Sequence, residues 1–279
     1  TVAILYVPNI VIFALAFLFT GLLVSSAIAS KTIENSVVTL RQDPRVNFVV
    51  ILIFVFLILT CVYIGNEVVK RIYSVKHFNS YNTALAQGDI GLAQTHLQRA
   101  RDLVDHDSYY REMALLHMVR IQRVLNSDMT EEEAVTQLSV LAPEMIRNAK
   151  DATTLNSNSF TNWFVLAQAY TVLIPFLDKE DSLIQIDQAY TNALKQNPTS
   201  PIVPLQRARL ALFEKEDSAA AKEYLYEAIA LKSDYVEALA LLSQIQAQEG
   251  SIDEAIVSTQ RALVANPLSI GLYFQLGFL

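Results

Sequence analysis

An unbroken apolar run from Phe48 to Leu59 constrains this chain more than any other feature. Its twelve residues are all Phe, Val, Ile or Leu, so a helix built from them has no polar face. The wider segment 46–65 lies between Arg45 and Glu67 and has about the 20 residues that a helix needs to cross a bilayer. We therefore predict a transmembrane helix over about 46–65, with the buried helix of a soluble protein as the alternative.

A second apolar run stands at the beginning of the chain, where residues 1–30 carry no charge. The run predicts another transmembrane helix over about 10–29. A signal peptide is the alternative, because 27–29 reads Ala-Ile-Ala, but no basic region precedes it and the apolar stretch is too long. The polar loop 31–45 makes 1–69 a predicted transmembrane hairpin, followed by a short basic linker at 70–76.

Charge is divided unevenly between the two parts of the chain. Residues 1–76 hold six basic and three acidic side chains, whereas residues 77–279 hold fifteen basic and twenty-five acidic ones. The acidic part would repel nucleic acid, so we expect no nucleic-acid partner. The positive excess beside the apolar runs fits a lipid bilayer with anionic headgroups. Three basic residues lie in the loop and three follow the second run, which leaves the side of the membrane undetermined.

The region after the apolar runs contains a repeat. Ala193, Ala228 and Ala262 are 35 and 34 residues apart, and each opens a similar stretch, two of which close at Pro198 and Pro267. Proline cannot continue the hydrogen-bond ladder of a helix, so these two residues mark helix ends. A repeat of this length indicates a helical solenoid, in which each unit buries its apolar face against the next.

The repeats resemble the tetratricopeptide repeat (TPR) family, whose unit is a pair of helices with an aromatic, a Leu-small pair and a Tyr on the first helix. Trp163, Leu166, Ala167 and Tyr170 match that pattern. Two further units match at Gly250, Ile252, Ala255, Ala262 and Pro267, and at Gly88, Ile90, Ala93, Leu97 and Ala100. The resemblance implies an all-α fold with a TPR-like solenoid over 77–279, in which Trp163 fills space between helices. The second unit is long, and the third carries extra residues around 175–181.

Residues with possible chemistry have simpler interpretations in this chain. We interpret His117 as a packing residue, His106 as part of a turn, and Thr130 with Glu131 to Glu133 as a helix start. The single cysteine, Cys61, excludes a disulfide framework and a thiolate zinc site. No metalloprotease spacing, nucleophile–base–acid trio or glycine-rich phosphate loop is present. We therefore expect no catalytic, metal or cofactor site in these residues.

The inner face of a TPR solenoid is its usual binding surface, and the resemblance places Gln168, Arg209, Glu237 and Gln244 there. We predict that these residues form a groove for a protein or peptide partner. The family's clamp for a peptide carboxylate needs several Lys, Asn and Arg residues, and Arg209 alone stands at these positions. A solvated face without a ligand is the alternative.

The order of apolar helices, basic stretch 70–76 and irregular TPR units is also similar to the C-terminal part of bacterial O-antigen ligase-like membrane proteins with TPR tails. That resemblance implies a fragment of a multi-pass inner-membrane protein of cell-envelope polysaccharide assembly, with catalysis in upstream segments. The alternative is a self-contained membrane-anchored scaffold without enzymatic activity. A soluble TPR co-chaperone is disfavoured by the apolar runs. We also expect the repeat that opens at 273–277 to be truncated, and the chain to fray after Pro267.

Overall fold

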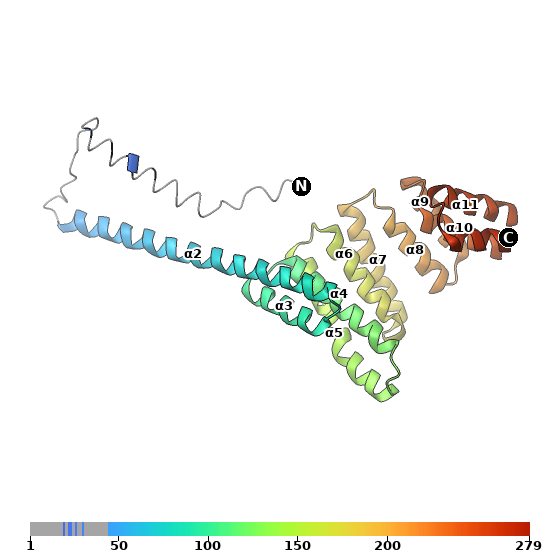
Figure 1. The fold of residues 1–279 in the computed structure, drawn as a ribbon, viewed down its shortest axis with the longest axis horizontal. Coiled ribbons are helices and arrows are strands. Elements are labelled where there is room, and N and C mark those ends of the chain that lie inside the picture. The colour runs from blue at the N-terminus through green and yellow to red at the C-terminus, as the bar shows by residue number, and fades with distance from the viewer. Residues whose placement is uncertain (1–18, 20–21, 24–25, 27–29, 31–43) are drawn as a thin grey trace. The chain divides into compact units, whose positions relative to one another are not determined.

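The computed structural model describes residues 44–279 and five earlier residues, namely Phe19, Leu22, Leu23, Ser26 and Ser30 (Figure 1). The chain divides into two compact units, Thr1–Glu67 and Val68–Leu279. The regular elements of the described residues are helices. In chain order they are α2 (Pro44–Ala86), α3 (Ile90–Leu103), α4 (Asp107–Leu125), α5 (Glu131–Leu155), α6 (Phe160–Leu173), the short 3-10 helix η1 (Ile174–Phe176), α7 (Lys179–Gln196), α8 (Ile202–Phe213), α9 (Ser218–Leu231), α10 (Val236–Gln248), α11 (Ile252–Ala265) and α12 (Ile270–Phe278).

The first unit is described mainly through helix α2. One helix among the described residues, Asn47–Ala86 within α2, is long and apolar enough to cross a membrane by length and composition. None of its apolar window is buried in the structure, in contrast to the core helix of a soluble protein. The predicted helix 46–65 falls inside α2. The other predicted helix, 10–29, lies outside the described residues except for four helical positions, so the hairpin stays a prediction.

The stretch 70–76 differs from the linker that the sequence suggested, because it is helical and belongs to α2. It contains no glycine or proline that would interrupt a helix. Its Ser74 is completely buried, and the hydroxyl donates to the Ala100 carbonyl at 2.9 Å and lies 3.0 Å from the Tyr109 hydroxyl, from which it can accept. The first repeat therefore begins before residue 77.

The second unit is a row of antiparallel helix pairs (Figure 1). The most extensive helix contacts are α4 with α5, α6 with α7, α8 with α9 and α10 with α11. Alanines at recurring positions allow these close approaches, since Ala193, Ala228 and Ala262 are each fully buried. Ala167 and Ala255, which the sequence also placed at helix contacts, are fully buried as well.

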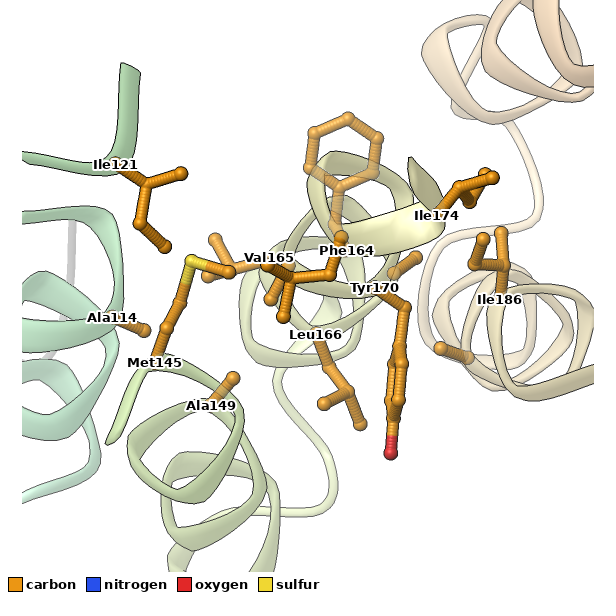
Figure 2. Close-up of a cluster of buried hydrophobic side chains, with 14 of the residues drawn as sticks. Ala114, Ile121, Met145, Ala149, Phe164, Val165, Leu166, Tyr170, Ile174 and Ile186 are labelled. Atoms are coloured by element: carbon orange, nitrogen blue, oxygen red, sulfur yellow. The ribbon is translucent and has the colours of Figure 1, made fainter. Parts of the chain in front are cut away.

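The largest core cluster joins helices α4 to α8, and Figure 2 shows its centre. Side chains from α4, α5, α6 and α7 meet there, among them Ile121, Met145, Leu166 and Ile186. A second cluster joins α8 to α12, and a third joins the end of α2 to α3 and α4. Neighbouring clusters share a helix, α4 or α8, so each repeat packs against the next, as a solenoid requires.

The helix ends follow the chemistry of the sequence. Thr130 caps the start of α5, as the sequence predicted, and Glu133 makes the cap a reciprocal capping box. Helices α7 and α11 end one residue before Asn197 and Asn266, each of which precedes a proline. Three turns between the helices of a pair need a positive φ, at Gly88 (77°), Gly250 (82°) and Glu216 (54°).

Helix α12 exposes most of its large apolar side chains. Leu272 is buried against α8 to α11, whereas Ile270, Tyr273, Phe274 and Phe278 are exposed. Among its polar residues, Gln275 donates to the Ala240 carbonyl of α10 at 3.2 Å. The fraying of the chain after Pro267 in solution stays a prediction.

Candidate partner-binding surface

The four residues predicted to line the groove all lie on first helices of the pairs. Gln168 is on α6, Arg209 is on α8, and Glu237 and Gln244 are on α10. Arg209, Glu237 and Gln244 are exposed and Gln168 is half-buried. The side chains of Arg209, Glu237 and Gln244 are therefore accessible to a partner. The role of all four residues in binding stays a prediction.

The structure brings two of these residues close to the same tyrosine. Burial raises the pKa of Tyr235, the nearby Glu237 carboxylate raises it further, and the Arg209 guanidinium opposes both. Lys232 covers the same ring, with Nζ 5.2 Å from the ring centroid. Arg209 and Glu237 thus present opposite charges near a half-buried aromatic, a combination common at protein interfaces.

The other two residues lie further away along the face. Gln244 follows Glu237 by seven residues on α10, so it lies two turns along the same face of that helix. Gln168 is half-buried on α6, a helix that contributes other residues to the α4–α8 core cluster. Arg209, Tyr235 and Glu237, with Gln244 further along α10, are therefore the candidate binding surface, and binding there stays a prediction.

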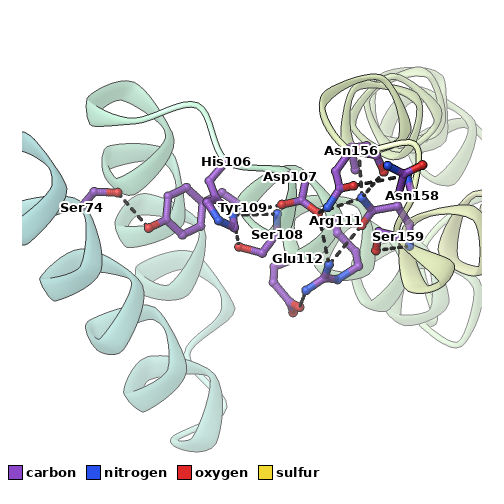
Figure 3. A network of polar contacts seen from close by, with 12 residues as sticks. Ser74, His106, Asp107, Ser108, Tyr109, Arg111, Glu112, Asn156, Asn158 and Ser159 are labelled. Atoms are coloured by element: carbon purple, nitrogen blue, oxygen red, sulfur yellow. Dashed lines mark hydrogen bonds and ion pairs between the residues drawn. The ribbon is translucent and has the colours of Figure 1, made fainter. Parts of the chain in front are cut away.

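A polar network lies at the junction of α4, α5 and α6 (Figure 3). Its centre is Asn162, which is completely buried and whose side-chain nitrogen donates to Asp107 Oδ2 at 2.9 Å and to the Ala152 carbonyl at 2.9 Å. Its oxygen accepts from Arg111 at 3.0 Å. Asp107 also accepts from the Asn156 side chain at 3.2 Å. These groups satisfy one another, so the network holds three helices together and leaves no group free for chemistry.

His106, Asp107 and Ser108 resemble a catalytic trio in composition, but their geometry is that of a helix cap. His106 Nδ1 lies 2.8 Å from the Ser108 hydroxyl and 3.2 Å from Asp107 Oδ1, and it also accepts from the Ser108 backbone N–H at 3.2 Å. A catalytic histidine contacts its nucleophile and its acid through opposite ring nitrogens. Here one nitrogen makes all three contacts, which agrees with the predicted role of His106 in a turn.

An open hollow of about 440 Å³ lies beside the α3–α4 turn. Arg101 stacks on the Tyr110 ring at 5.2 Å and donates to Asn148 at 2.9 Å, while the Tyr110 hydroxyl donates to Asp105 at 2.7 Å. The hollow is polar and these groups are paired with one another. No group of three or more potential ligands for a metal ion occurs among the described residues.

Two further sequence interpretations can be compared with the structure. His117 is 4% exposed and its Nδ1 has no hydrogen-bond partner, which confirms its interpretation as a packing residue. Burial is the main cause that lowers its pKa to about 4. Trp163 packs against the core cluster but is half-buried, and its indole N–H donates to the Ser157 carbonyl at 2.7 Å. Trp163 is less enclosed than the sequence suggested, because it lies in the first turn of α6 and its indole bonds to the loop before that helix.

Sequence reasoning missed the role of Asn162 and the conformation of Glu216. An asparagine at a helix start resembles any surface polar residue, and the four partners of Asn162 come from several segments, two of them more than 50 residues away. A signal for Glu216 existed, because it stands 34 residues before Gly250.

Solved structures identify the architecture of the helix pairs. A similar structure is TTC0263, a thermophilic TPR protein in Thermus thermophilus, with a TM-score of 0.53 and 19% sequence identity over 74% of this chain and 97% of that one. The second unit has a TPR-like fold. This confirms the predicted repeats and the all-α solenoid.

Two other solved structures are also similar, with lower TM-scores and sequence identities. A monomeric mutant of IFIT1 with Gppp-AAAA has a TM-score of 0.50 at 13% identity, covering 68% of this chain and 46% of that one. YrrB, a TPR protein with an unusual peptide-binding site, has a TM-score of 0.46 at 12% identity, covering 74% of this chain and 92% of that one. No protein-family model matches the chain, and no curated protein matches it.

Proposed function

We propose that this chain is a membrane-anchored scaffold. It holds a protein partner on the face of its TPR-like solenoid formed by the first helix of each pair, such as α6, α8 and α10. The observation that carries the proposal is the Arg209–Tyr235–Glu237 site, which presents both charges and an aromatic on a fold made of repeated helix pairs. Such solenoids offer extended faces for partners. The mixed charge favours a polypeptide segment that also carries both signs.

The exposed apolar part of α2 supports the anchor. Large apolar side chains such as Phe48, Phe56 and Leu59 are more than half exposed in the structure. Exposing such a run to water is costly, and a bilayer removes that cost. A bacterial inner-membrane location with a hairpin of helices 10–29 and 46–65 is the finer form of this proposal.

The link to O-antigen ligase-like proteins has no support from the comparisons. We retain membrane polysaccharide assembly as a second candidate on the order of segments alone. The catalytic groups of that function would lie outside this chain, and no described residue is assigned to it.

Charge reversal on the solenoid tests the scaffold. Partners crosslinked to the full chain in membranes are compared among wild type, Arg209→Glu, Glu237→Arg and the control Lys195→Glu, an exposed residue on the second helix α7. We expect loss of a specific crosslinked protein in the first two variants and its retention in the control. Equal recovery in all four would contradict the proposed face. Flotation with phosphatidylcholine vesicles tests the anchor separately, since a chain without one stays at the bottom of the gradient.

A further inference from the structure

Two histidines meet where α2 packs on α3. The Nδ1 atoms of His77 on α2 and His96 on α3 lie 3.4 Å apart. The ring centroids are further apart, at 5.6 Å, so both Nδ1 atoms face the space between the rings. Both side chains are half-buried, so the pair is partly accessible to solvent and to a small ion.

Contacts on either side of the pair hold the two helices at this distance. The Ser74 hydroxyl, one turn before the first histidine, donates to the Ala100 carbonyl, one turn after the second, at 2.9 Å. In the other direction along the helices, Tyr81 on α2 and Ala93 on α3 are buried in the same core cluster. The histidines therefore stand on helices that are fixed to each other, as a pre-organised pair of ligands requires.

The separation of the two nitrogens fits tetrahedral metal ligation better than a hydrogen bond. An N–H donor usually lies about 2.7–3.2 Å from an oxygen acceptor, so 3.4 Å is long for an N–H···N bond. Zinc–imidazole bonds of about 2.0–2.1 Å, set at the tetrahedral angle, separate two ligand nitrogens by about 3.3–3.4 Å. The right angles of a square-planar or octahedral site would place them about 2.8–3.0 Å apart. The observed distance thus favours zinc, which is almost always tetrahedral in protein sites.

We propose that His77 and His96 bind a zinc ion through their Nδ1 atoms, with water in the other two positions of a tetrahedral site. Each ring then carries its proton on Nε2. No group of three or more potential metal ligands occurs in the part of the chain that the structure describes, so two protein ligands hold the ion. The two histidines become neighbours through helix packing, which is why residue spacing along the chain predicted no metal site. Such a site keeps exchangeable positions, in contrast to a structural zinc site with four protein ligands.

Two positive side chains lie next to the pair in sequence. Lys76 directly precedes His77, Arg99 follows His96 by one turn of α3, and both are exposed. Their charges oppose a bound cation and make the site weaker than its ligands alone would. The double variant Lys76→Gln, Arg99→Gln should therefore bind zinc more tightly than wild type.

Zinc titration of the full chain in detergent tests the inference. Zinc chloride is added in competition with a chromophoric chelator, and we expect wild type to bind one ion. His77→Gln and His96→Gln should each lose this binding, because a single imidazole cannot chelate the ion. The control His106→Asn removes an exposed imidazole but keeps a side-chain acceptor at the start of α4, so it should bind zinc as wild type does.

Cobalt reports the geometry of the site without any substitution, so the test does not depend on the folding of a variant. Tetrahedral Co2+ absorbs visible light far more strongly than octahedral Co2+. Wild type loaded with cobalt chloride should show the strong bands and lose them when zinc chloride is added.

Three results would overturn the inference. The first is no zinc bound by wild type, or equal binding by wild type and both histidine variants. The second is an octahedral cobalt spectrum, which excludes the tetrahedral pair. The third is weaker zinc binding by Lys76→Gln, Arg99→Gln than by wild type, because those charges would then not oppose the ion. Neither the membrane anchor nor the partner surface enters these measurements, so they test the site independently of the proposed function.

Discussion

Glu216 and Gly250 stand 34 residues apart and occupy the same turn of consecutive repeats, each with a positive φ. Gly250 adopts φ 82° without strain, whereas Glu216 holds φ 54° with a full side chain. A left-handed conformation costs a residue with a Cβ about 1–2 kcal/mol. The α8–α9 turn therefore stores strain that the α10–α11 turn avoids.

Glycine at this turn should increase stability. Glu216→Gly relieves the strain of the folded turn but also gives the unfolded chain more conformational entropy. We expect the net effect to raise the free energy of unfolding by about 0.5–1 kcal/mol. Gly250→Ala should lower it by about 1 kcal/mol, and by backbone strain alone, because no atom lies within 4 Å of the added Cβ. Chemical denaturation in detergent measures both. Lys215→Gly is the control, and a gain there equal to that of Glu216→Gly would refute the strain.

Loss of Asn162 should destabilise the junction of α4, α5 and α6. Asn162→Ala leaves Asp107 and Arg111 without partners that the structure gives them, and such unsatisfied groups cost about 1–3 kcal/mol. Asn158→Ala, four residues earlier and exposed, should change stability by less than about 0.5 kcal/mol. Thermal melts compare the two. Similar small effects would mean that the network does not stabilise the fold.

His117 should make the protein less stable in acid. Its pKa is about 4 in the folded protein and about 6.5 when unfolded, so the unfolded state binds more protons between these values. The contribution of neutral His117 to the free energy of unfolding is therefore fully present above about pH 6.5. It is lost as the pH drops towards 4, which lowers that free energy by at most about 3 kcal/mol. His117→Leu should reduce the slope of stability against pH in that window. An unchanged slope, measured by denaturation at several pH values, would show that His117 does not titrate this way.

Trp163 should matter more than Gln168, though both lie on α6. Because Trp163 is half-buried, we expect Trp163→Ala to cost about 3 kcal/mol, the low end of the range for large aromatics. Gln168→Ala should cost well under about 1 kcal/mol. Melting temperatures of the two variants show which substitution destabilises the protein more. Equal small effects would mean that Trp163 does not pack in the core and that the TPR register assigned to α6 is wrong.

Cysteine labelling should place the loop 31–45 and the solenoid on opposite sides of the membrane. Ser36→Cys and the exposed position Thr83→Cys are compared in a background in which Cys61 is replaced by serine. In sealed vesicles, an impermeant reagent should reach one of them from outside, and the other after the vesicles are opened. Labelling of both from the same side would rule out the hairpin.

The sequence by itself determined the kind of fold and where its repeats lie. Alanines 34 and 35 residues apart, the Trp163–Tyr170 pattern and the prolines after α7 and α11 encode local contacts, and a solenoid is built almost entirely from local contacts. The helix start at Thr130 and the turn at His106 could be predicted for the same reason. The apolar run 46–65 was equally plain, because twelve large apolar side chains exclude a polar face.

Tertiary structure decided what depends on partners distant in sequence. The basic stretch 70–76 looked like a linker until Ser74 was seen to bond Tyr109, 35 residues away. Asn162 gained its role from Asp107 and Arg111 on another helix. The charges of Arg209 and Glu237 both act on Tyr235, and the rings of His77 and His96 meet because α2 packs on α3. Periodicity specifies which face of a helix is buried, whereas the packing of two helices specifies which polar groups meet.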